Sequence, residues 1–388
     1  MPIKKIADIE VSGKTLIVRV DFNISFLDGK ILDDFRIRSE IEPILKLIAR
    51  GAKIIMIAHL GRPEGKFEEK YSLKRVAEYF SGLINKKIIF DRIENSELPK
   101  KISQMSSGDI IFLENLRFYP GEEKNDDEFA KKLASLGDIY VNDAFAVSHR
   151  AHASVEAITR FIPSYAGDLF EKEVSVLSRI MQNPPRPLVV IIGGSKISTK
   201  IKLIDIFLKE KKCDHVLVGG ALANNILMAL GIGVGRSLIE KDMIGDVKKL
   251  DITSNKLHIP CDVVVSTRPN RDDAVLRGVG NVGEEEAIYD IGPDTIGIFE
   301  NIIKKSKMVI WNGPMGYFEK REFATGTEEV AKFVAESGAY SVIGGGETVS
   351  VLDYMKLLDK IQHISTAGGA MMEYLAGEEM PGVKALEK

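Results

Sequence analysis

The sequence predicts an α/β protein of two domains, each built around a parallel β-sheet covered by helices. Three observations support this prediction. Short β-branched runs alternate with amphipathic stretches along the whole chain, which is the pattern of βαβ units. A length of 388 residues is more than one hydrophobic core usually supports. Pro184, Pro185 and Pro187 end a charged helical stretch, so a new unit is expected to begin there.

In the first half of the chain, five apolar runs are short enough to be strands. They are Thr15–Val20, Lys53–Ala58, Lys87–Phe90, Asp109–Leu113 and Asp138–Val141. Isoleucine and leucine recur at helical spacing from Ile37 to Ile48, which predicts one helix with Gly51 just after its end. Asn125 and Glu128 have the spacing of a capping pair at the start of the next helix.

The second half repeats this rhythm. Its expected strands are Pro187–Ile192, His215–Val218, Asp262–Val265, Lys307–Ile310, Tyr340–Ile343 and Ile361–Ile364. We therefore predict a first domain over about residues 1–168 and a second over 169–369, with an interdomain helix over about 171–182.

Composition excludes several classes of protein. The net charge of −3 offers no field for nucleic acid or for an anionic membrane, so neither is an expected partner. Two cysteines, Cys213 and Cys261, do not make a disulfide framework. The first residues lack the apolar stretch of a signal peptide, and the apolar runs are too short to span a bilayer. A cytoplasmic location is expected.

Basic side chains follow the predicted strands of the first half. In open parallel sheets, ligands bind beyond the carboxyl ends of the strands. One arginine there is usually a surface ion pair, but five arginines and three histidines on one edge would repel one another unless an anion neutralised them. These residues are Arg19, Arg36, His59, Arg62, Arg117, His149, Arg150 and His152. The pattern indicates a binding site for a small polyanion.

Glycine and lysine follow the strands of the second half. Glycine lets a phosphate approach the backbone, and the N–H groups of a following helix supply partial positive charge. A single Gly-Gly is often only a tight turn. Five such turns lie at 193–194, 219–220, 313–316, 344–346 and 368–369, and Lys196 and Lys200 are one helical turn apart. Together they predict a cradle for nucleotide phosphates.

Three other motifs are rejected. Gly278–Gly283 matches G-x-G-x-x-G, but three glutamates follow where a pyrophosphate would lie, so a loop is expected. The sequence contains no P-loop motif. His149 and His152 have the spacing of metal ligands, but Arg150 between them favours an anion over zinc.

The motifs RVDFN, HLGRP, LENLRF, VNDAF, HRAH, GGSK, WNGP, GGGET and PGVKAL occur in this order from about residue 8 to residue 386. In this the chain resembles the phosphoglycerate kinase family. The resemblance implies two doubly wound, Rossmann-like domains joined by a helix and hinge. It also implies that about residues 370–388 return to the first domain. The implied reaction is reversible phosphoryl transfer between 1,3-bisphosphoglycerate and ADP, giving 3-phosphoglycerate and ATP in glycolysis, with Mg²⁺. A monomer is expected rather than a dimer.

The resemblance also implies residue roles. The phosphoglycerate site would comprise Asp21, Asn23, Arg36, His59, Arg62, Arg117 and Arg150, supported by Arg19, His149 and His152. The nucleotide site would comprise Lys196, Lys200, Gly219, Gly220, Asn312, Pro314, Glu319, Gly345, Gly346, Glu347 and Thr348. The catalytic group would be Arg36, Lys196, Gly368 and Gly369, which hold the transferring phosphoryl group from opposite domains as a hinge closes.

The chain departs from the family pattern at Glu347, where many members have an aspartate that contacts Mg²⁺, so Glu347 is taken only as a candidate metal ligand. Ala367 replaces a common glycine. Two other classes stay open at this point: a dehydrogenase on a doubly wound fold, and a binding protein without turnover.

Overall fold

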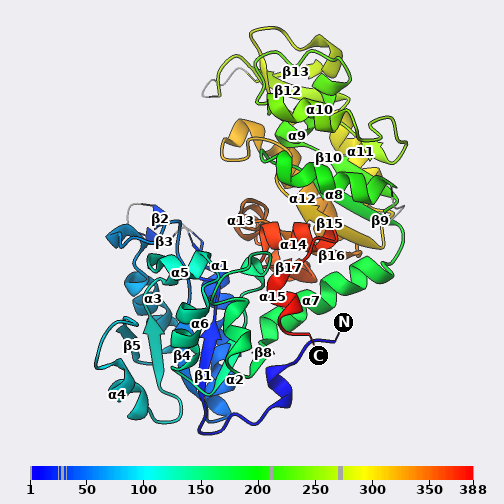
Figure 1. Cartoon of the computed structure of the whole chain (residues 1–388). Helices are drawn as coiled ribbons and strands as arrows, with labels where there is room; N and C mark the ends of the chain where they lie inside the picture. Colours follow the sequence, from blue (N-terminus) through cyan, green and yellow to red (C-terminus); the bar gives the residue numbers. More distant parts are fainter. Residues whose placement is uncertain are drawn as a thin grey trace. The chain divides into compact units, whose positions relative to one another are not determined.

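The computed structural model describes residues 2–24, 26–27, 30–31, 33–209, 213–269 and 274–387. The chain divides into two compact units (Figure 1). Unit 1 comprises Met1–Leu177 and Glu378–Lys388, and unit 2 comprises Ser178–Gly377. The predicted domain boundaries, at 168/169 and about 369/370, fall near these limits, inside helices α7 (Asp168–Gln182) and α14 (Gly368–Leu375).

Unit 1 is built on a six-stranded, fully parallel sheet with the strand order β5-β6-β4-β1-β7-β8. Its strands are β1 (Thr15–Arg19), β4 (Lys53–Ile57), β5 (Ile88–Asp91), β6 (Ile110–Leu113), β7 (Ile139–Asn142) and β8 (Ser164–Ala166). Besides α7, its helices are α1 (Phe35–Ser39), α2 (Ile41–Ala49), α3 (Lys74–Ile84), α4 (Leu98–Ser103), α5 (Pro120–Glu123), α6 (Asp127–Ala134) and α15 (Pro381–Lys384). Two strands of two residues each, β2 (Phe26–Leu27) and β3 (Lys30–Ile31), pair antiparallel before α1.

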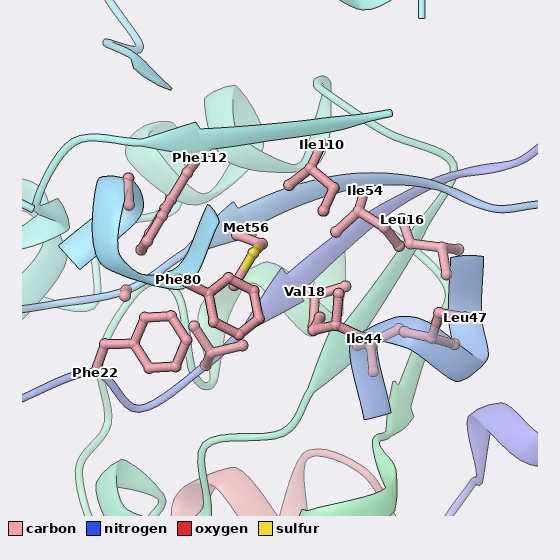
Figure 2. Packing of buried hydrophobic residues seen from close by; sticks show 14 of the residues in the cluster. Leu16, Val18, Phe22, Ile44, Leu47, Ile54, Met56, Phe80, Ile110 and Phe112 are labelled. Carbon is pink, nitrogen blue, oxygen red and sulfur yellow. The ribbon is translucent and has the colours of Figure 1, made fainter. Parts of the chain in front are cut away.

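Both faces of this sheet are buried under helices. Side chains of one strand alternate between the two faces, so Leu16 and Val18 join one hydrophobic cluster while Ile17 joins the other. The first cluster packs against Ile44 of α2 and Phe80 of α3, as Figure 2 shows. The second packs against residues of α4 and α6. Strands covered on both faces explain the continuous apolar runs in the sequence.

Unit 2 repeats this architecture with the strand order β11-β10-β9-β15-β16-β17, again fully parallel. Its sheet strands are β9 (Leu188–Ile192), β10 (His215–Val218), β11 (Leu257–His258), β15 (Met308–Asn312), β16 (Tyr340–Gly344) and β17 (His363–Ser365). Besides α14, its helices are α8 (Ser198–Lys209), α9 (Gly220–Ala229), α10 (Ile244–Val247), α11 (Pro293–Ile303), α12 (Thr325–Glu336) and α13 (Gly346–Tyr354). The predicted α/β class is confirmed. Within the residues described, no helix has the length and apolar character needed to cross a membrane.

Short 3-10 turns link many of these elements. They are η1 (Ile6–Asp8), η2 (Glu69–Tyr71), η3 (Leu116–Phe118), η4 (Phe145–Val147), η5 (Ala157–Arg160), η6 (Lys241–Met243), η7 (Val279–Asn281), η8 (Arg321–Phe323) and η9 (Leu358–Lys360).

One predicted strand does not join the parallel sheet. Asp262–Val265 falls in β12 (Asp262–Ser266), which pairs antiparallel with β13 (Val275–Gly278) and β14 (Ala287–Ile291) in a separate three-stranded sheet. The hydrophobic pattern of a run indicates that the run is extended, but it does not indicate which strand the run pairs with. The rejected glycine motif, Gly278–Gly283, begins at the last residue of β13 and leads through the short turn at Val279–Asn281 to strand β14, not to an α-helix.

Two local predictions are wrong in detail. The helix expected from Ile37 to Ile48 is two helices, α1 and α2, that meet at Glu40. The cap of α6 is Asp126, whose side chain accepts the backbone N–H of Phe129 at 2.8 Å. Asn125 instead has a left-handed backbone (φ 54°), and its Oδ1 accepts the N–H of Ala157 at 3.1 Å.

Candidate functional site

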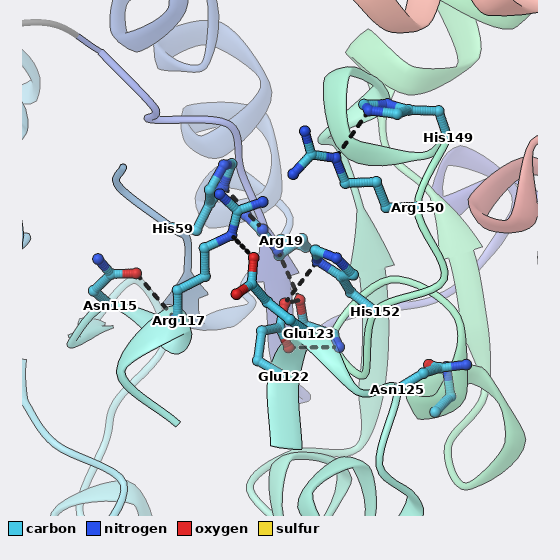
Figure 3. Close-up of polar contacts among 12 residues, drawn as sticks. Arg19, His59, Asn115, Arg117, Glu122, Glu123, Asn125, His149, Arg150 and His152 are labelled. Atoms are coloured by element: carbon cyan, nitrogen blue, oxygen red, sulfur yellow. Dashed lines mark hydrogen bonds and ion pairs between the residues drawn. The ribbon is translucent and has the colours of Figure 1, made fainter. Parts of the chain in front are cut away.

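The basic residues of unit 1 gather at the carboxyl ends of four adjacent strands. β1 pairs with β4 on one side and β7 on the other, and β6 lies next to β4. The connections after β1 therefore run toward one edge of the sheet, and the later strands β7 and β8 lie on the other side of β1. Open parallel sheets form a ligand-binding crevice at such a reversal point. Arg19 ends β1, His59 follows β4, Arg117 follows β6, and Arg150 belongs to the segment after β7. We call Arg19, His59, Arg117, His149, Arg150 and His152 the basic cluster; Figure 3 shows them together.

Arg19 is held by a buried hydrogen-bond chain. Its Nε donates to Ser154 Oγ at 3.0 Å, and the Ser154 hydroxyl donates to Glu122 Oε1 at 2.6 Å. Arg19 Nη2 lies 3.2 Å from His59 Nδ1. Arg19 and Glu122 are both almost inaccessible to solvent. These hydrogen bonds fix the position of Arg19 within the cluster, and Ser154 links its guanidinium group to the carboxyl group of Glu122.

Arg117 and Arg150, the other two arginines of the cluster, are held differently. Arg117 Nη1 donates to the carbonyl of Gly61 at 2.7 Å, and its Nε lies 3.3 Å from Glu123 Oε1. Its buried Nη2 has no hydrogen-bond acceptor among the described residues. Arg150 Nε donates to His149 Nε2 at 2.9 Å. Burial and the neighbouring Arg150 lower the pKa of Arg117 to about 10. A buried guanidinium with an unused donor is a ready anion ligand.

All three histidines of the cluster are held neutral. Burial, followed by the charges of Arg19 and Arg117, lowers the pKa of His59 well below its usual value. Burial and Arg150 lower the pKa of His149 to about 4. Burial and Arg117 lower the pKa of His152 to about 3. A bound anion would reverse the electrostatic part of these shifts, so anion binding is expected to be coupled to proton uptake.

Asp21, Asn23 and Arg36 form a second group just beyond β1. Arg36 Nη1 donates to the carbonyl of Asn23 at 2.9 Å and lies 3.0 Å from Asp21 Oδ2. Asp21 Oδ1 accepts the N–H of Asn23 at 3.2 Å, and Asn23 Oδ1 accepts the N–H of Gly61 at 2.9 Å. This group therefore joins the loops after β1 and β4. Arg62 is exposed on the latter loop.

In unit 2 the glycine turns pack directly against one another. Gly194 N–H donates to the carbonyl of Pro314 at 2.7 Å, and Gly220 N–H donates to that of Met315 at 2.7 Å. A Cβ on Gly313, whose φ is +95°, would lie 2.3 Å from the carbonyl oxygen of Gly193. Only glycine fits these turns, so their first role is to let three backbone segments meet. Gly219 is the N-terminal cap of α9.

Lys200 lies beneath the first of these turns, in the first turn of α8. Its buried Nζ donates to the carbonyl of Gly193. Burial lowers the pKa of Lys200 to about 8. The negative charge of Glu347 raises this pKa, and the positive charge of Lys196 lowers it further. A Cβ on Gly194 would lie 2.9 Å from Lys200 Nζ and 3.8 Å from Glu347 Oε2, so both charges border that glycine. Lys196 and Glu347 are exposed.

Two further turns meet at the starts of α13 and α14. Asn312 Nδ2 donates to the carbonyl of Gly344 at 2.9 Å, and the Thr348 hydroxyl accepts the N–H of Gly313 at 2.9 Å. A Cβ on Gly368 would lie 3.6 Å from the α-carbon of Gly345. By contrast, Gly346 and Gly369 face open space. Their backbones are therefore accessible to a ligand.

A pocket of about 480 Å³ opens beside these turns. Its lining includes Gly194, Gly220, Pro314, Glu319 and Glu347 from the predicted nucleotide site, together with Ala221, Asn224, Leu238, Tyr289 and Met315. Such a volume with mostly apolar walls and a few polar groups is typical of a site for a small molecule.

Sequence reasoning missed the buried acids that support both sites. Glu122 anchors Arg19 through Ser154, and burial raises its pKa. Asp290 lies on the pocket wall and accepts the N–H groups of Ile291 and Gly326 at 2.9 and 2.7 Å. Burial raises the pKa of Asp290 to about 7. Neither acid follows a strand of the main sheets, so the strand-end pattern could not reveal them.

The family model, the curated relatives and the solved structures that match this chain all have the same name. A family model described as phosphoglycerate kinase matches residues 6–378. A phosphoglycerate kinase from Coprothermobacter proteolyticus is 44% identical over 100% of this chain and 99% of its own length. One from Pelotomaculum thermopropionicum is 42% identical over 99% of this chain and 98% of its own. Among solved structures, phosphoglycerate kinase from Pyrococcus horikoshii has a TM-score of 0.89 at 33% identity and covers 99% of this chain and 98% of that one. That from Coxiella burnetii has a TM-score of 0.85 at 37% identity, covering 99% of each.

Proposed function

The chain belongs to the phosphoglycerate kinase family, and from this we infer that unit 1 holds the phosphoglycerate and unit 2 holds the nucleotide. The reaction of the family is reversible phosphoryl transfer between 1,3-bisphosphoglycerate and ADP, which gives 3-phosphoglycerate and ATP in glycolysis. Membership of this family excludes the dehydrogenase alternative.

The arginines and histidines gathered at the strand ends of unit 1 carry the assignment of the phosphoglycerate site. Arg117 has a buried donor without an acceptor among the described residues, and burial, together with nearby arginines, lowers the pKa of the three histidines. A ligand with one phosphate and one carboxylate suits these arginines, because a guanidinium group can donate two parallel hydrogen bonds to two oxygens of either group. We assign it to Asp21, Asn23, Arg36, His59, Arg62, Arg117 and Arg150.

The turns of unit 2 support the nucleotide assignment. Apolar walls next to Pro314 and Gly220 suit a flat base, and Glu319 on the same wall suits the ribose hydroxyls. Phosphates would lie toward Lys196, Lys200, Asn312 and the accessible N–H groups of Gly346 and Gly369, because α13 and α14 begin there. Gly219, Gly345 and Thr348 shape these turns, as their packing and hydrogen bonds indicate.

The carboxylate of Glu347 also fits the Mg²⁺ that the family implies. Mg²⁺ is usually held by one or two carboxylates together with substrate phosphates and water. Glu347 supplies one exposed carboxylate beside the phosphate-binding lysine Lys200. When bound, the metal ion would neutralise charge on the nucleotide phosphates.

The chemistry then depends on position and charge. The attacking group is already an anion, either the carboxylate of 3-phosphoglycerate or the β-phosphate of ADP, so no general base is required. We propose that Arg36 and Lys196 stabilise the transferring phosphoryl group, with the N–H groups of Gly368 and Gly369 completing its surroundings. These residues belong to different units. The proposed scheme therefore includes a hinge closure, which would also exclude water.

A coupled assay of ATP-dependent turnover of 3-phosphoglycerate, with and without Mg²⁺, tests this proposal. Arg36→Ala should lower kcat on the order of a thousandfold, and Lys196→Ala should also lower it strongly, because each removes positive charge from the transition state. Arg38→Ala is the matched control, since Arg38 lies on the same helix, is exposed and pairs with Asp34. A near-normal kcat for Arg36→Ala would exclude its role. Binding of both ligands without turnover in the wild type would indicate a binding protein.

A further inference from the structure

A buried carboxylate joins two elements of unit 2 at the wall of the pocket. Asp290, on strand β14, is 2% exposed and lines the pocket. One of its oxygens accepts the N–H of Ile291 at 2.9 Å, and the other accepts the N–H of Gly326 at 2.7 Å. Gly326 lies in the first turn of α12. Both carboxylate oxygens are therefore bonded to backbone N–H groups, one of them at the start of a helix.

The turn that follows β15 packs against the same carboxylate. A Cβ on Gly316 would lie 2.3 Å from Asp290 Oδ1 and 2.6 Å from the carbonyl oxygen of Tyr289. The next residue, Tyr317, donates its N–H to that carbonyl at 2.7 Å. No side chain larger than that of glycine fits between the turn and β14, so the position of the carboxylate determines the position of the turn.

This turn carries Glu319 to the pocket. The N–H of Lys320 donates to the carbonyl of Tyr317 at 3.0 Å and so closes the turn around Glu319. Before the turn, the N–H of Met315 donates to the hydroxyl of Thr327, in the first turn of α12, at 3.0 Å. Glu319 itself is exposed and lines the pocket. Its carboxylate is therefore placed by a backbone segment that is held to β14 and α12.

We propose that Asp290 is a positioning residue for ribose recognition: it fixes the turn after β15 against β14 and α12, so that the carboxylate of Glu319 reaches the ribose hydroxyls of the nucleotide. This inference rests on the proposed contact between Glu319 and the ribose. Asp290 acts through the backbone in this scheme and contacts no ligand. A carboxylate is required because both of its terminal atoms accept hydrogen bonds, whereas the amide of asparagine would present a donor to one of the two N–H groups.

The chain offers a matched control in Asp262. This side chain is 6% exposed, and it accepts the N–H groups of Asp294 and Thr295, in the first turn of α11, at 3.0 and 2.8 Å. A Cβ on Gly292 would lie 2.3 Å from Asp262 Oδ2. Asp262 thus supports a helix and packs against a glycine as Asp290 does, but it is not among the described residues that line the pocket.

The test compares ATP with 2′,3′-dideoxy-ATP, which lacks both ribose hydroxyls, in the coupled assay. The wild-type KM should be about ten- to a hundredfold higher for the dideoxy nucleotide, because hydrogen bonds to a charged group are lost. Asp290→Asn should raise the KM for ATP and lower this ratio to about threefold or less, with little change in kcat at saturating ATP. Asp262→Asn should keep the wild-type ratio, although thermal unfolding shows a similar loss of stability. A wild-type ratio in Asp290→Asn, or an equal fall in both variants, would overturn the proposal.

Two further variants make the result decisive. Gly316→Ala disturbs the same contact from the side of the turn and should also lower the ratio. If Asp290→Asn does not fold, a wild-type ratio in folded Gly316→Ala refutes the proposal. Glu319→Ala should bring the ratio close to one. If it does so while Asp290→Asn keeps the wild-type ratio, the inference about Asp290 fails and the role of Glu319 stands. A wild-type ratio in Glu319→Ala would instead exclude the ribose contact itself.

Discussion

Lys200 shows how burial adjusts a single charge in the proposed nucleotide site. With a pKa lowered to about 8 by burial, Lys200 is protonated below that pH and loses its positive charge above it. Since nucleotide phosphates attract only the charged form, ATP affinity should fall as the pH rises from 8 to 9.5, by up to about tenfold per unit. Lys200→Arg keeps its charge throughout and should flatten this dependence. Calorimetric titration of ATP at several pH values measures it, with Lys209→Arg at the other end of α8 as the control. Identical slopes in wild type and Lys200→Arg would contradict the assignment.

The histidines of the basic cluster predict acid sensitivity. The folded-state pKa of His152, about 3, lies below the ordinary value of 6.5, so the unfolded chain takes up the proton first as the pH falls. Stability from this group is therefore complete above pH 6.5 and is lost between pH 6.5 and 3, at up to about 1.4 kcal/mol per unit. His152→Gln should make the thermal midpoint less dependent on pH between 6.5 and 5. An unchanged dependence would show that His152 does not contribute to acid unfolding.

At the scale of elements, the glycine turns predict opposite effects of one substitution at two positions. Gly313→Ala places a Cβ 2.3 Å from a backbone oxygen at a φ of +95°, so it should destabilise unit 2 by about 2 kcal/mol or more and raise the KM for ATP. Gly297→Ala, inside α11 and facing open space, should instead stabilise the protein by about 1 kcal/mol and leave the KM unchanged. Denaturant titration and steady-state kinetics test both. A mild effect of Gly313→Ala would mean that the three turns can move apart.

The elements that the sequence could predict are those whose signal is local. Alternation of apolar runs with helical periodicity identified five of the six described strands of each parallel sheet, because residues such as Leu16 and Ile17 are buried on opposite faces of one strand. The short edge strands β8 and β11 were missed. The same signal could not place β12, since its pairing with β14 depends on residues distant in sequence. Strand-end arginines predicted the basic cluster, but the partners of Arg19 come from Glu122 and Ser154, more than a hundred residues away. The break at Glu40 was also hidden, because α1 and α2 share one apolar periodicity.

At the scale of the whole molecule, the last residues of the chain belong to unit 1. The N–H of Lys4 donates to the carbonyl of Leu386 at 2.9 Å, and that of Gly382 donates to the carbonyl of Ser148, next to His149 and Arg150. Deleting residues 378–388 should therefore weaken binding of 3-phosphoglycerate and lower the stability of unit 1, while binding of ATP to unit 2 persists. Calorimetric titration with each ligand distinguishes the two. An equal loss of both affinities would mean that the deletion unfolds the whole protein.

The return of the chain to unit 1 has a consequence for biosynthesis. Unit 2, from Ser178 to Gly377, is in effect an insertion within unit 1. As the polypeptide leaves the ribosome, the first 177 residues emerge long before the segment that completes them. They must wait, incompletely packed, while unit 2 is translated. A released chain that ends at Gly377 should therefore resist proteases in unit 2 more than in unit 1, although unit 1 is synthesised first.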